Sequence, residues 1–231
     1  MIEERNTMNR VALKSDAKCA LKEAVVNPYI VSLIVWIISM IFFGIQYFLD
    51  LWRELEEFEN FDQMRSFLIS CAVYIIIYFL INTWIQFGFY SYCLKVANRD
   101  RTMSYGDLFS SAGYFFKAAA LTLMINLLVF LWTLLFIIPG IIAAYRYSQA
   151  MFVMVENPDK GVMQCIRESK EMMIGHKWEF FVLEVSFILW QLLSAFTCGL
   201  ALIYVAPYMT VTMAGYYNKI KLKPAADEAY E

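Results

Sequence analysis

The chain has 231 residues, of which 61% are hydrophobic and only 17% are charged, well below the roughly 25% charged residues of soluble domains. This composition excludes an intrinsically disordered chain, a collagen-like chain and a small disulfide scaffold. The formal net charge is -2 and no basic domain stands out, which argues against nucleic acid as a partner. We therefore expect an integral membrane protein whose first partners are membrane lipids.

Four apolar stretches are long enough to cross the hydrocarbon core of a bilayer, which takes about 20 residues of helix. Two of them, Pro28–Leu49 and Phe67–Cys93, fit single spans. The other two, Ala118–Val155 and Phe180–Tyr217, would each be about 57 Å long as one helix, nearly twice the thickness of the core. Each therefore reverses once, and the predicted turns are Pro139-Gly140 and Thr197-Cys198-Gly199.

The predicted fold is an all-α, polytopic membrane bundle of six transmembrane helices, a single domain over residues 1–231. The predicted spans are about 28–49, 67–93, 118–138, 141–155, 180–198 and 200–217. The fourth is short for a full crossing, so a re-entrant or tilted segment is the alternative there.

Lysine and arginine predict the orientation, because they accumulate in cytoplasmic segments. Six spans with both termini in the cytoplasm leave only Arg53 and Arg65 of the 19 basic residues outside, and Arg146 within a helix. The same scheme places three amphipathic helices at the cytoplasmic interface, at about 9–26, 104–116 and 158–174. The second begins with a capping-box pair, Ser104 and Asp107, and the third with Asn157-Pro158.

The first amphipathic helix carries a candidate lipid-facing basic stripe. Lys14, Lys18 and Lys22 follow one another at four-residue spacing, beside an apolar side made of Leu13, Ala17, Ala20, Leu21 and Ala24. A helix of this pattern is expected to lie on an anionic leaflet, with its apolar face down and its lysines toward the head groups.

Polar residues at helix depth form a candidate intramembrane site. Arg146 and Glu184 should differ in depth by roughly 5–8 Å, within reach of an arginine side chain, and a lone charge in a membrane is costly. The pair is interpreted as a substrate or proton site, as a structural clamp, or as two side chains that reach separate interfaces. Asn82 and Asn126 either line a hydrophilic path with them or hold helices together.

Two further patterns bear on partners and chemistry. Ala206, Thr210 and Ala214 form a small-residue stripe that permits close helix approach, within the chain or in a homodimer. His176 is the only histidine, so a multi-histidine metal site cannot be built. The chain also lacks phosphate-binding loops, dinucleotide fingerprints and catalytic-serine motifs, so we expect no catalytic, cofactor-binding or metal-binding residues.

The second half of the chain resembles a bacterial membrane family catalogued as domain of unknown function 975. The resemblance is densest from residue 136 to 217, and it is looser upstream, at Gly88 and Asp107 for example. The residues that carry it include Ile138-Pro139-Gly140, Tyr145-Arg146-Tyr147-Ser148, Glu156-Asn157-Pro158-Asp159, Gly175-His176-Lys177-Trp178 and Pro207-Tyr208. The resemblance implies a multi-pass protein of the bacterial cytoplasmic membrane and supplies no activity.

Three hypotheses for function follow from these patterns. The favoured one is a non-enzymatic membrane module that binds lipid or a partner protein, including a second copy, through its amphipathic helices. The alternative is a small permease or exporter that uses the Arg146 and Glu184 pair. An intramembrane enzyme, dependent on a residue such as His176 or Glu184, is the third.

Overall fold

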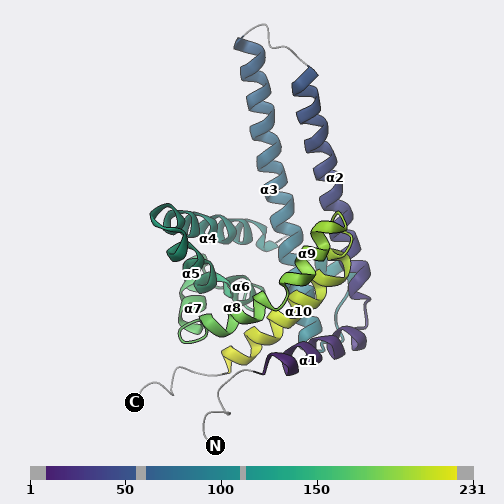
Figure 1. Ribbon diagram of the computed structural model, residues 1–231, viewed down its shortest axis with the longest axis vertical. Helices are drawn as coiled ribbons and strands as arrows, with labels where there is room; N and C mark the ends of the chain where they lie inside the picture. Colours follow the sequence, from purple (N-terminus) through teal and green to yellow (C-terminus); the bar gives the residue numbers. More distant parts are fainter. Residues whose placement is uncertain (1–8, 56–60, 110–112, 223–231) are drawn as a thin grey trace, which may run out of the picture.

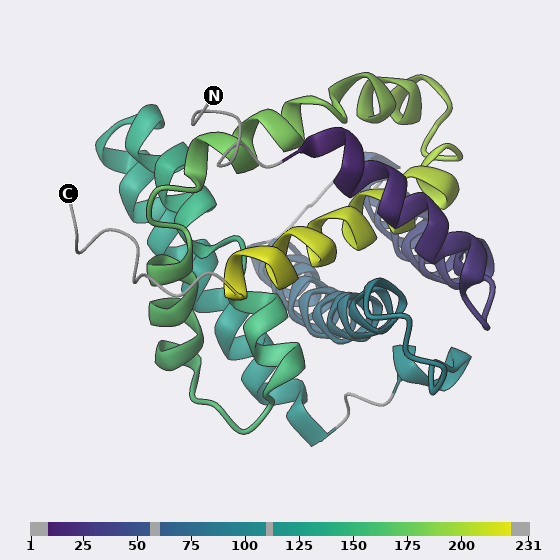
Figure 2. The same ribbon diagram turned by 90° about the horizontal axis from the view of Figure 1, so that it is seen from below.

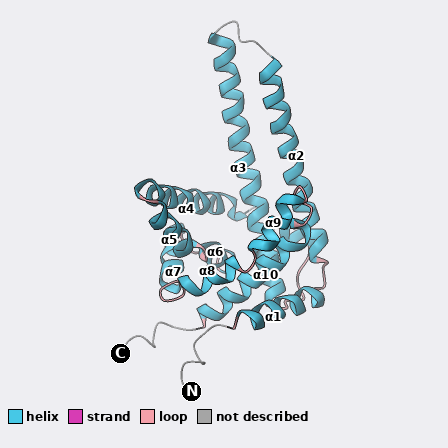
Figure 3. Cartoon of the chain, viewed as in Figure 1, coloured by secondary structure: helices cyan, strands magenta, loops and turns pink. Residues whose placement is uncertain are grey.

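The computed structural model describes residues 9–55, 61–109 and 113–222, and within these ranges the chain is built from helices with no β-strand (Figures 1 and 3). The expected all-α fold is confirmed. The helices are α1 Arg10–Glu23, α2 Pro28–Leu55, α3 Phe61–Ala97, the 3₁₀ turn η2 Tyr105–Leu108, α4 Phe115–Leu135, α5 Ile137–Tyr147, α6 Ala150–Glu156, α7 Val162–Met172, α8 Lys177–Val185, α9 Ile188–Phe196 and α10 Leu202–Lys221.

Helices α2 and α3 form a long hairpin that projects from the rest of the molecule (Figure 1). The Tyr74 hydroxyl joins them by donating a hydrogen bond to the Phe42 carbonyl oxygen at 2.6 Å. Away from the bundle the hairpin exposes large apolar side chains on both helices, such as Phe43 and Leu68. A surface of this kind is costly in water and is accommodated by lipid, so the hairpin is compatible with a membrane protein.

Within the described residues, four segments are long and apolar enough to cross a membrane: Pro28–Leu51, Phe61–Ala97, Phe115–Leu135 and Lys177–Phe196. The six predicted spans are therefore not confirmed. The predicted fourth span, 141–155, is divided into α5 and α6 by Ser148 and Gln149. The predicted sixth span corresponds to α10, which is long enough to cross a membrane but is less apolar than the four candidate segments.

Helices α4 and α5 form a second, shorter hairpin, which lies crosswise to the α2–α3 hairpin (Figures 1 and 2). The predicted turn at Pro139-Gly140 is wrong by a few residues, because the chain reverses at Phe136, whose backbone is extended. Pro139 instead lies in the first turn of α5, where a missing N–H removes no helical hydrogen bond. The tip of this hairpin is strongly apolar and exposed around Phe136.

The predicted fifth helix, 180–198, is interrupted at Ser186 and Phe187, which separate α8 from α9. Phe187 is completely buried and stacks edge-on against Tyr208 of α10 at 5.3 Å between ring centroids. The predicted turn that follows is confirmed, because α9 ends at Phe196 and both Cys198 and Gly199 have positive φ angles.

A helix is present where the first amphipathic helix is predicted, as α1, and Asn9 caps it by accepting hydrogen bonds from the backbone N–H groups of Val11 and Ala12. Its apolar face is nevertheless not free to enter lipid, because most of it is buried against the protein. The buried members of that face are Leu13, Ala17, Ala20 and Leu21. They pack mainly against α10, with further contacts to α3.

The other two amphipathic segments are shorter than predicted. In the described part of 104–116, η2 covers Tyr105–Leu108 and α4 begins at Phe115, and residues 110–112 lie outside the described residues. Its predicted capping box is confirmed, with Ser104 and Asp107 bonded reciprocally. The third segment, predicted at 158–174, is α7, whose N-cap is Gly161 rather than Asn157.

Helix α10 is central to the packing, because it contacts α1, α2 and α3. The buried apolar side chains form two clusters, and α10 contributes residues to both. The beginning of α1 and the end of α10 lie at the same end of the molecule, away from the tip of the α2–α3 hairpin (Figures 1 and 2). The basic residues of α1 are therefore held at the end of the molecule where the apolar segment of α2 begins.

Candidate functional site

The predicted pair of Arg146 and Glu184 is not joined by an ion pair among the described side chains. Glu184, half-buried on α8, instead lies within hydrogen-bonding reach of the Tyr145 hydroxyl on α5. The Tyr145 ring packs edge-on against Phe180 at 5.9 Å and against Phe181 at 6.0 Å. The contact between α5 and α8 thus involves Tyr145, the residue beside the one predicted, and it places a phenol rather than a second charge next to the carboxylate.

The candidate asparagines do not complete a site around these groups. Asn82 is half-buried on α3 and Asn126 is exposed on α4. Within the described residues, no hydrogen bond joins either amide to Arg146, Glu184 or the other asparagine. The described hydrogen bonds and ion pairs therefore do not connect the four predicted residues with one another, and the shared polar site stays a prediction.

A small polar cluster explains why α5 ends before α6. The Ser169 hydroxyl donates to the Arg146 carbonyl oxygen at 2.9 Å and accepts from the Gln149 backbone N–H at 3.2 Å. Gln149 is fully buried and its side-chain amide donates to the Ser148 hydroxyl at 3.0 Å. Ser169 of α7 thus satisfies backbone groups that a continuous helix would have paired internally.

The basic stripe of α1 is divided between two environments. The Lys14 ammonium donates to the Ser186 carbonyl oxygen at 3.1 Å, in the break between α8 and α9, and lies 4.0 Å from the Phe187 ring centroid. The Lys18 ammonium lies 5.5 Å from the Tyr208 ring centroid, whereas Lys22 is exposed in the last turn of α1. Lys14 and Lys18 are therefore turned toward the bundle, and only part of the stripe faces away from it.

Arg99 fastens α1 to the end of α3, a role that the sequence alone did not suggest. Its guanidinium contacts Asp16 at 2.6 Å and Glu23 at 2.9 Å, so it bridges the second half of α1. Arg99 itself has a positive φ of 52°. Beside it, the Asn218 amide of α10 donates to the Asn98 side-chain oxygen at 2.7 Å. The only indication of this contact in the sequence was the pair of acidic residues, Asp16 and Glu23, on the polar side of α1.

A second ion pair docks η2 on α3. The Lys95 ammonium lies 2.8 Å from an Asp107 oxygen, and the other oxygen of this buried carboxylate accepts from the Ser104 backbone N–H at 2.8 Å. Gly88 permits the approach, because a Cβ there would stand 2.1 Å from the Leu108 carbonyl oxygen. This cluster holds η2 against α3, and it explains why Ser104 and Asp107 have the capping pattern in the sequence.

The small-residue stripe of α10 is used at least partly inside the chain. Ala214 is completely buried, and Ala206 and Thr210 are half-buried.

A group of three or more histidine, cysteine or acidic side chains suited to a metal ion does not occur in the described part of the chain. His176 contacts the Glu179 carboxylate at 3.2 Å, within the turn that opens α8.

No curated protein and no solved structure matches the chain. The family described as "Protein of unknown function (DUF975)" matches residues 8–143 and 133–223, which together cover nearly the whole sequence. The matched ranges include α1 as well as the apolar hairpins, so the family pattern extends over both the basic and the membrane-compatible parts. The chain therefore belongs to this family of unknown function.

Proposed function

We propose that the chain is a non-enzymatic module of the bacterial cytoplasmic membrane, with both termini in the cytoplasm, that binds lipid or a partner protein. The observation that carries the proposal is the fixed position of α1. Its apolar face is buried on α10, and Arg99 holds its acidic side. A basic helix is thereby presented as a preformed surface at the end of α2 where the apolar segment begins (Figure 1).

Electrostatics favours a membrane-proximal role for such a helix. Each lysine or arginine close to an anionic leaflet contributes about 1 kcal/mol of attraction. Preorganisation adds to this, since a helix that is already folded and docked loses little conformational entropy when it binds. The exposed apolar flanks of the α2–α3 hairpin and the exposed apolar tip of the α4–α5 hairpin supply the apolar contact with lipid that basic attraction alone does not provide.

The alternative, a small permease or exporter built on Arg146 and Glu184, has less support. Glu184 lies beside Tyr145, and among the described side chains no hydrogen bond or ion pair connects it with Arg146, Asn82 or Asn126. A transport site concentrates its charged groups around a cavity at membrane depth, which this arrangement does not resemble.

The proposal is tested by native mass spectrometry of the protein released gently from its own membrane. We expect a stoichiometric lipid or protein companion that is lost when Lys14, Lys18 and Lys22 are all changed to glutamate. A variant with glutamate at Arg101, Lys170 and Lys219 is the control, because these three basic residues are exposed elsewhere on the surface and the change in charge is equal. A wild-type protein that carries no companion, or an equal loss in the control, contradicts the proposal.

A further inference from the structure

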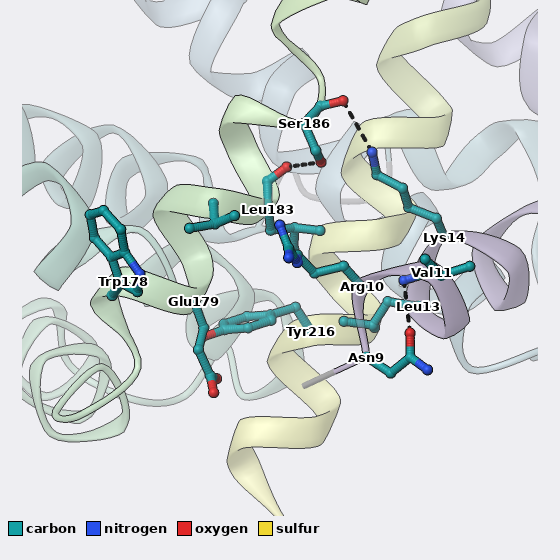
Figure 4. A pocket seen from close by; sticks show the side chains of 11 residues that line it. Asn9, Arg10, Val11, Leu13, Lys14, Trp178, Glu179, Leu183, Ser186 and Tyr216 are labelled. Carbon is teal, nitrogen blue, oxygen red and sulfur yellow. Dashed lines mark hydrogen bonds between the residues drawn. The ribbon is translucent and has the colours of Figure 1, made fainter. Parts of the chain in front are cut away.

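An open pocket of about 860 Å³ lies between the first turns of α1, helix α8 and the C-terminal half of α10 (Figure 4). Its α1 wall carries two cations, Arg10 and Lys14. The opposite wall is apolar and belongs to α8, with Trp178, Val182 and Leu183. The pocket therefore combines positive charge on one side with apolar surface on the other.

The two cations have no carboxylate partner among the described residues. Glu179, the acid that lines the pocket, contacts His176 and is turned away from Arg10 (Figure 4). Lys14 is half-buried and is met by a carbonyl oxygen and an aromatic ring rather than by an anion. A partly desolvated cation in this situation gains most from an anionic ligand, because charge-assisted hydrogen bonds are roughly twice as strong as neutral ones.

The electrostatic field at Lys14 agrees with this geometry. Burial, followed by the neighbouring charges of Lys18 and Arg10, lowers the pKa of the Lys14 ammonium. Burial disfavours a charge of either sign, whereas the positive charges of Lys18 and Arg10 disfavour a further cation and favour an anion at this position.

The apolar side of the pocket continues outward to the surface. Val11 and Trp178 stand on its rim and are 77% and 72% exposed, whereas Leu183 lies below them and is 1% exposed. Tryptophan is enriched at membrane–water interfaces, where its ring meets both acyl chains and head groups. Since α8 belongs to the membrane-compatible segment Lys177–Phe196, the rim is continuous with a surface suited to lipid.

We propose that this pocket binds one anionic phospholipid, with its phosphate between Arg10 and Lys14 and the start of its acyl chains along Val182, Leu183 and Trp178. The assignment rests on the proposed function and gives it a site and a ligand class. Charge complementarity selects an anion, and the exposed apolar rim selects an amphiphile over a free anion. A volume of about 860 Å³ is within the usual range of roughly 300–1,000 Å³ for ligand pockets.

The test uses the full-length protein in neutral detergent, titrated with phosphatidylglycerol or phosphatidylcholine and followed by native mass spectrometry. We expect one tightly retained phosphatidylglycerol and a preference of about tenfold over phosphatidylcholine. Arg10→Gln with Lys14→Gln should weaken phosphatidylglycerol binding about tenfold. Arg101→Gln with Lys219→Gln, which removes one arginine and one lysine from exposed positions outside the pocket, should leave the affinity within about twofold.

A second pair of variants tests the apolar wall without changing charge. Trp178→Ala should weaken binding severalfold, whereas Phe116→Ala, which removes another strongly exposed ring, should not. Equal effects within either pair, or equal binding of the two lipids, would overturn the assignment. Binding of inorganic phosphate as tight as that of phosphatidylglycerol, and unchanged by Trp178→Ala, would also overturn it, in favour of a free phosphate site.

These outcomes are separate from a failure of the proposed function. The pocket assignment fails if phosphatidylglycerol binding does not depend on Arg10, Lys14 and Trp178, even when the protein carries a protein companion from its own membrane. The proposed function fails if the protein released from that membrane carries neither lipid nor protein, whatever the pocket variants do.

Discussion

Gly140 of α5 lies so close to Thr133 of α4 that a Cβ on Gly140 would stand 2.1 Å from the Thr133 Oγ1 and 2.9 Å from its Cα. The Thr133 side chain is held in place, because its hydroxyl donates to the Val129 carbonyl oxygen at 2.8 Å. Small residues permit this backbone-to-backbone approach between helices in membranes. Gly140 therefore determines how closely the α4–α5 hairpin is packed.

Gly140→Ala should destabilise the protein by about 1–3 kcal/mol, because the added methyl group forces the two helices apart. The measurement is the melting temperature of the detergent-solubilised protein. Gly44→Ala in α2 is the matched control, since nothing lies within 4 Å of a Cβ there and alanine is the better helix former. Similar melting temperatures for the two variants would mean that the close approach does not limit stability.

The interaction between α5 and α8 can be tested with double-mutant cycles. We expect Tyr145→Phe and Glu184→Gln to be coupled by about 0.5–1.5 kcal/mol, the usual net contribution of one hydrogen bond. Arg146→Ala and Glu184→Gln should be additive within about 0.5 kcal/mol, because no ion pair joins them. Unfolding in denaturant measures both cycles, and stronger coupling through Arg146 than through Tyr145 would refute this arrangement.

The hydropathy of the sequence predicted where the apolar segments lie, but it did not predict where the helices within them are interrupted. The turn after α9 was predictable, because Gly199 accepts the positive φ that the turn requires. The breaks at Ser148-Gln149 and at Ser186-Phe187 contain neither proline nor glycine. They depend on distant partners instead, since Ser169 satisfies the first break and Lys14 contacts the second. Such tertiary contacts cannot be predicted from the local sequence around each break.

The first helix shows a similar limit. The spacing of Leu13 and Ala17 correctly predicted a helix in which both are on the buried side, but periodicity does not distinguish a lipid surface from a protein surface. Its apolar face meets α10, and Arg99 holds its acidic side. Lys14 was recognised in the sequence for its charge, whereas its position in a pocket with Trp178 depends on how α1 and α8 are placed.

Arg99→Asn should loosen α1 while leaving the rest of the bundle folded. Asparagine tolerates the positive φ at this position, so the change chiefly removes the contacts with Asp16 and Glu23. Because these side chains are about half exposed, we expect a global loss below about 1 kcal/mol.

Hydrogen exchange provides the readout for α1. Amide protection in α1 should fall in Arg99→Asn and stay unchanged in Arg101→Asn, a nearby exposed arginine for which the described residues provide no ion-pair partner. Unchanged protection of α1 in Arg99→Asn would show that burial on α10 alone holds the helix.

Glu156 should make stability sensitive to acid. Its carboxylate receives a hydrogen bond from the Tyr217 hydroxyl at 2.6 Å and one from the Lys221 ammonium at 2.5 Å, so it connects α6 to α10. Burial acts to raise the pKa of Glu156, but these hydrogen bonds and the charge of Lys221 together outweigh it and hold the pKa below its ordinary value of 4.5. A lowered pKa in the folded state means stabilisation that is fully present above the unfolded-state pKa and is lost as the pH falls through the folded-state pKa.

Wild-type protein should therefore melt about 2–4 °C above Glu156→Gln at neutral pH, consistent with roughly 1 kcal/mol for a partly exposed pair. The difference should shrink as the pH falls below 4.5 and vanish once the wild-type carboxylate is protonated. Glu171→Gln, an exposed carboxylate on α7, serves as the control and should show neither effect. A gap between wild type and Glu156→Gln that persists unchanged into acid would assign the stabilisation to packing of the side chain and not to its charge.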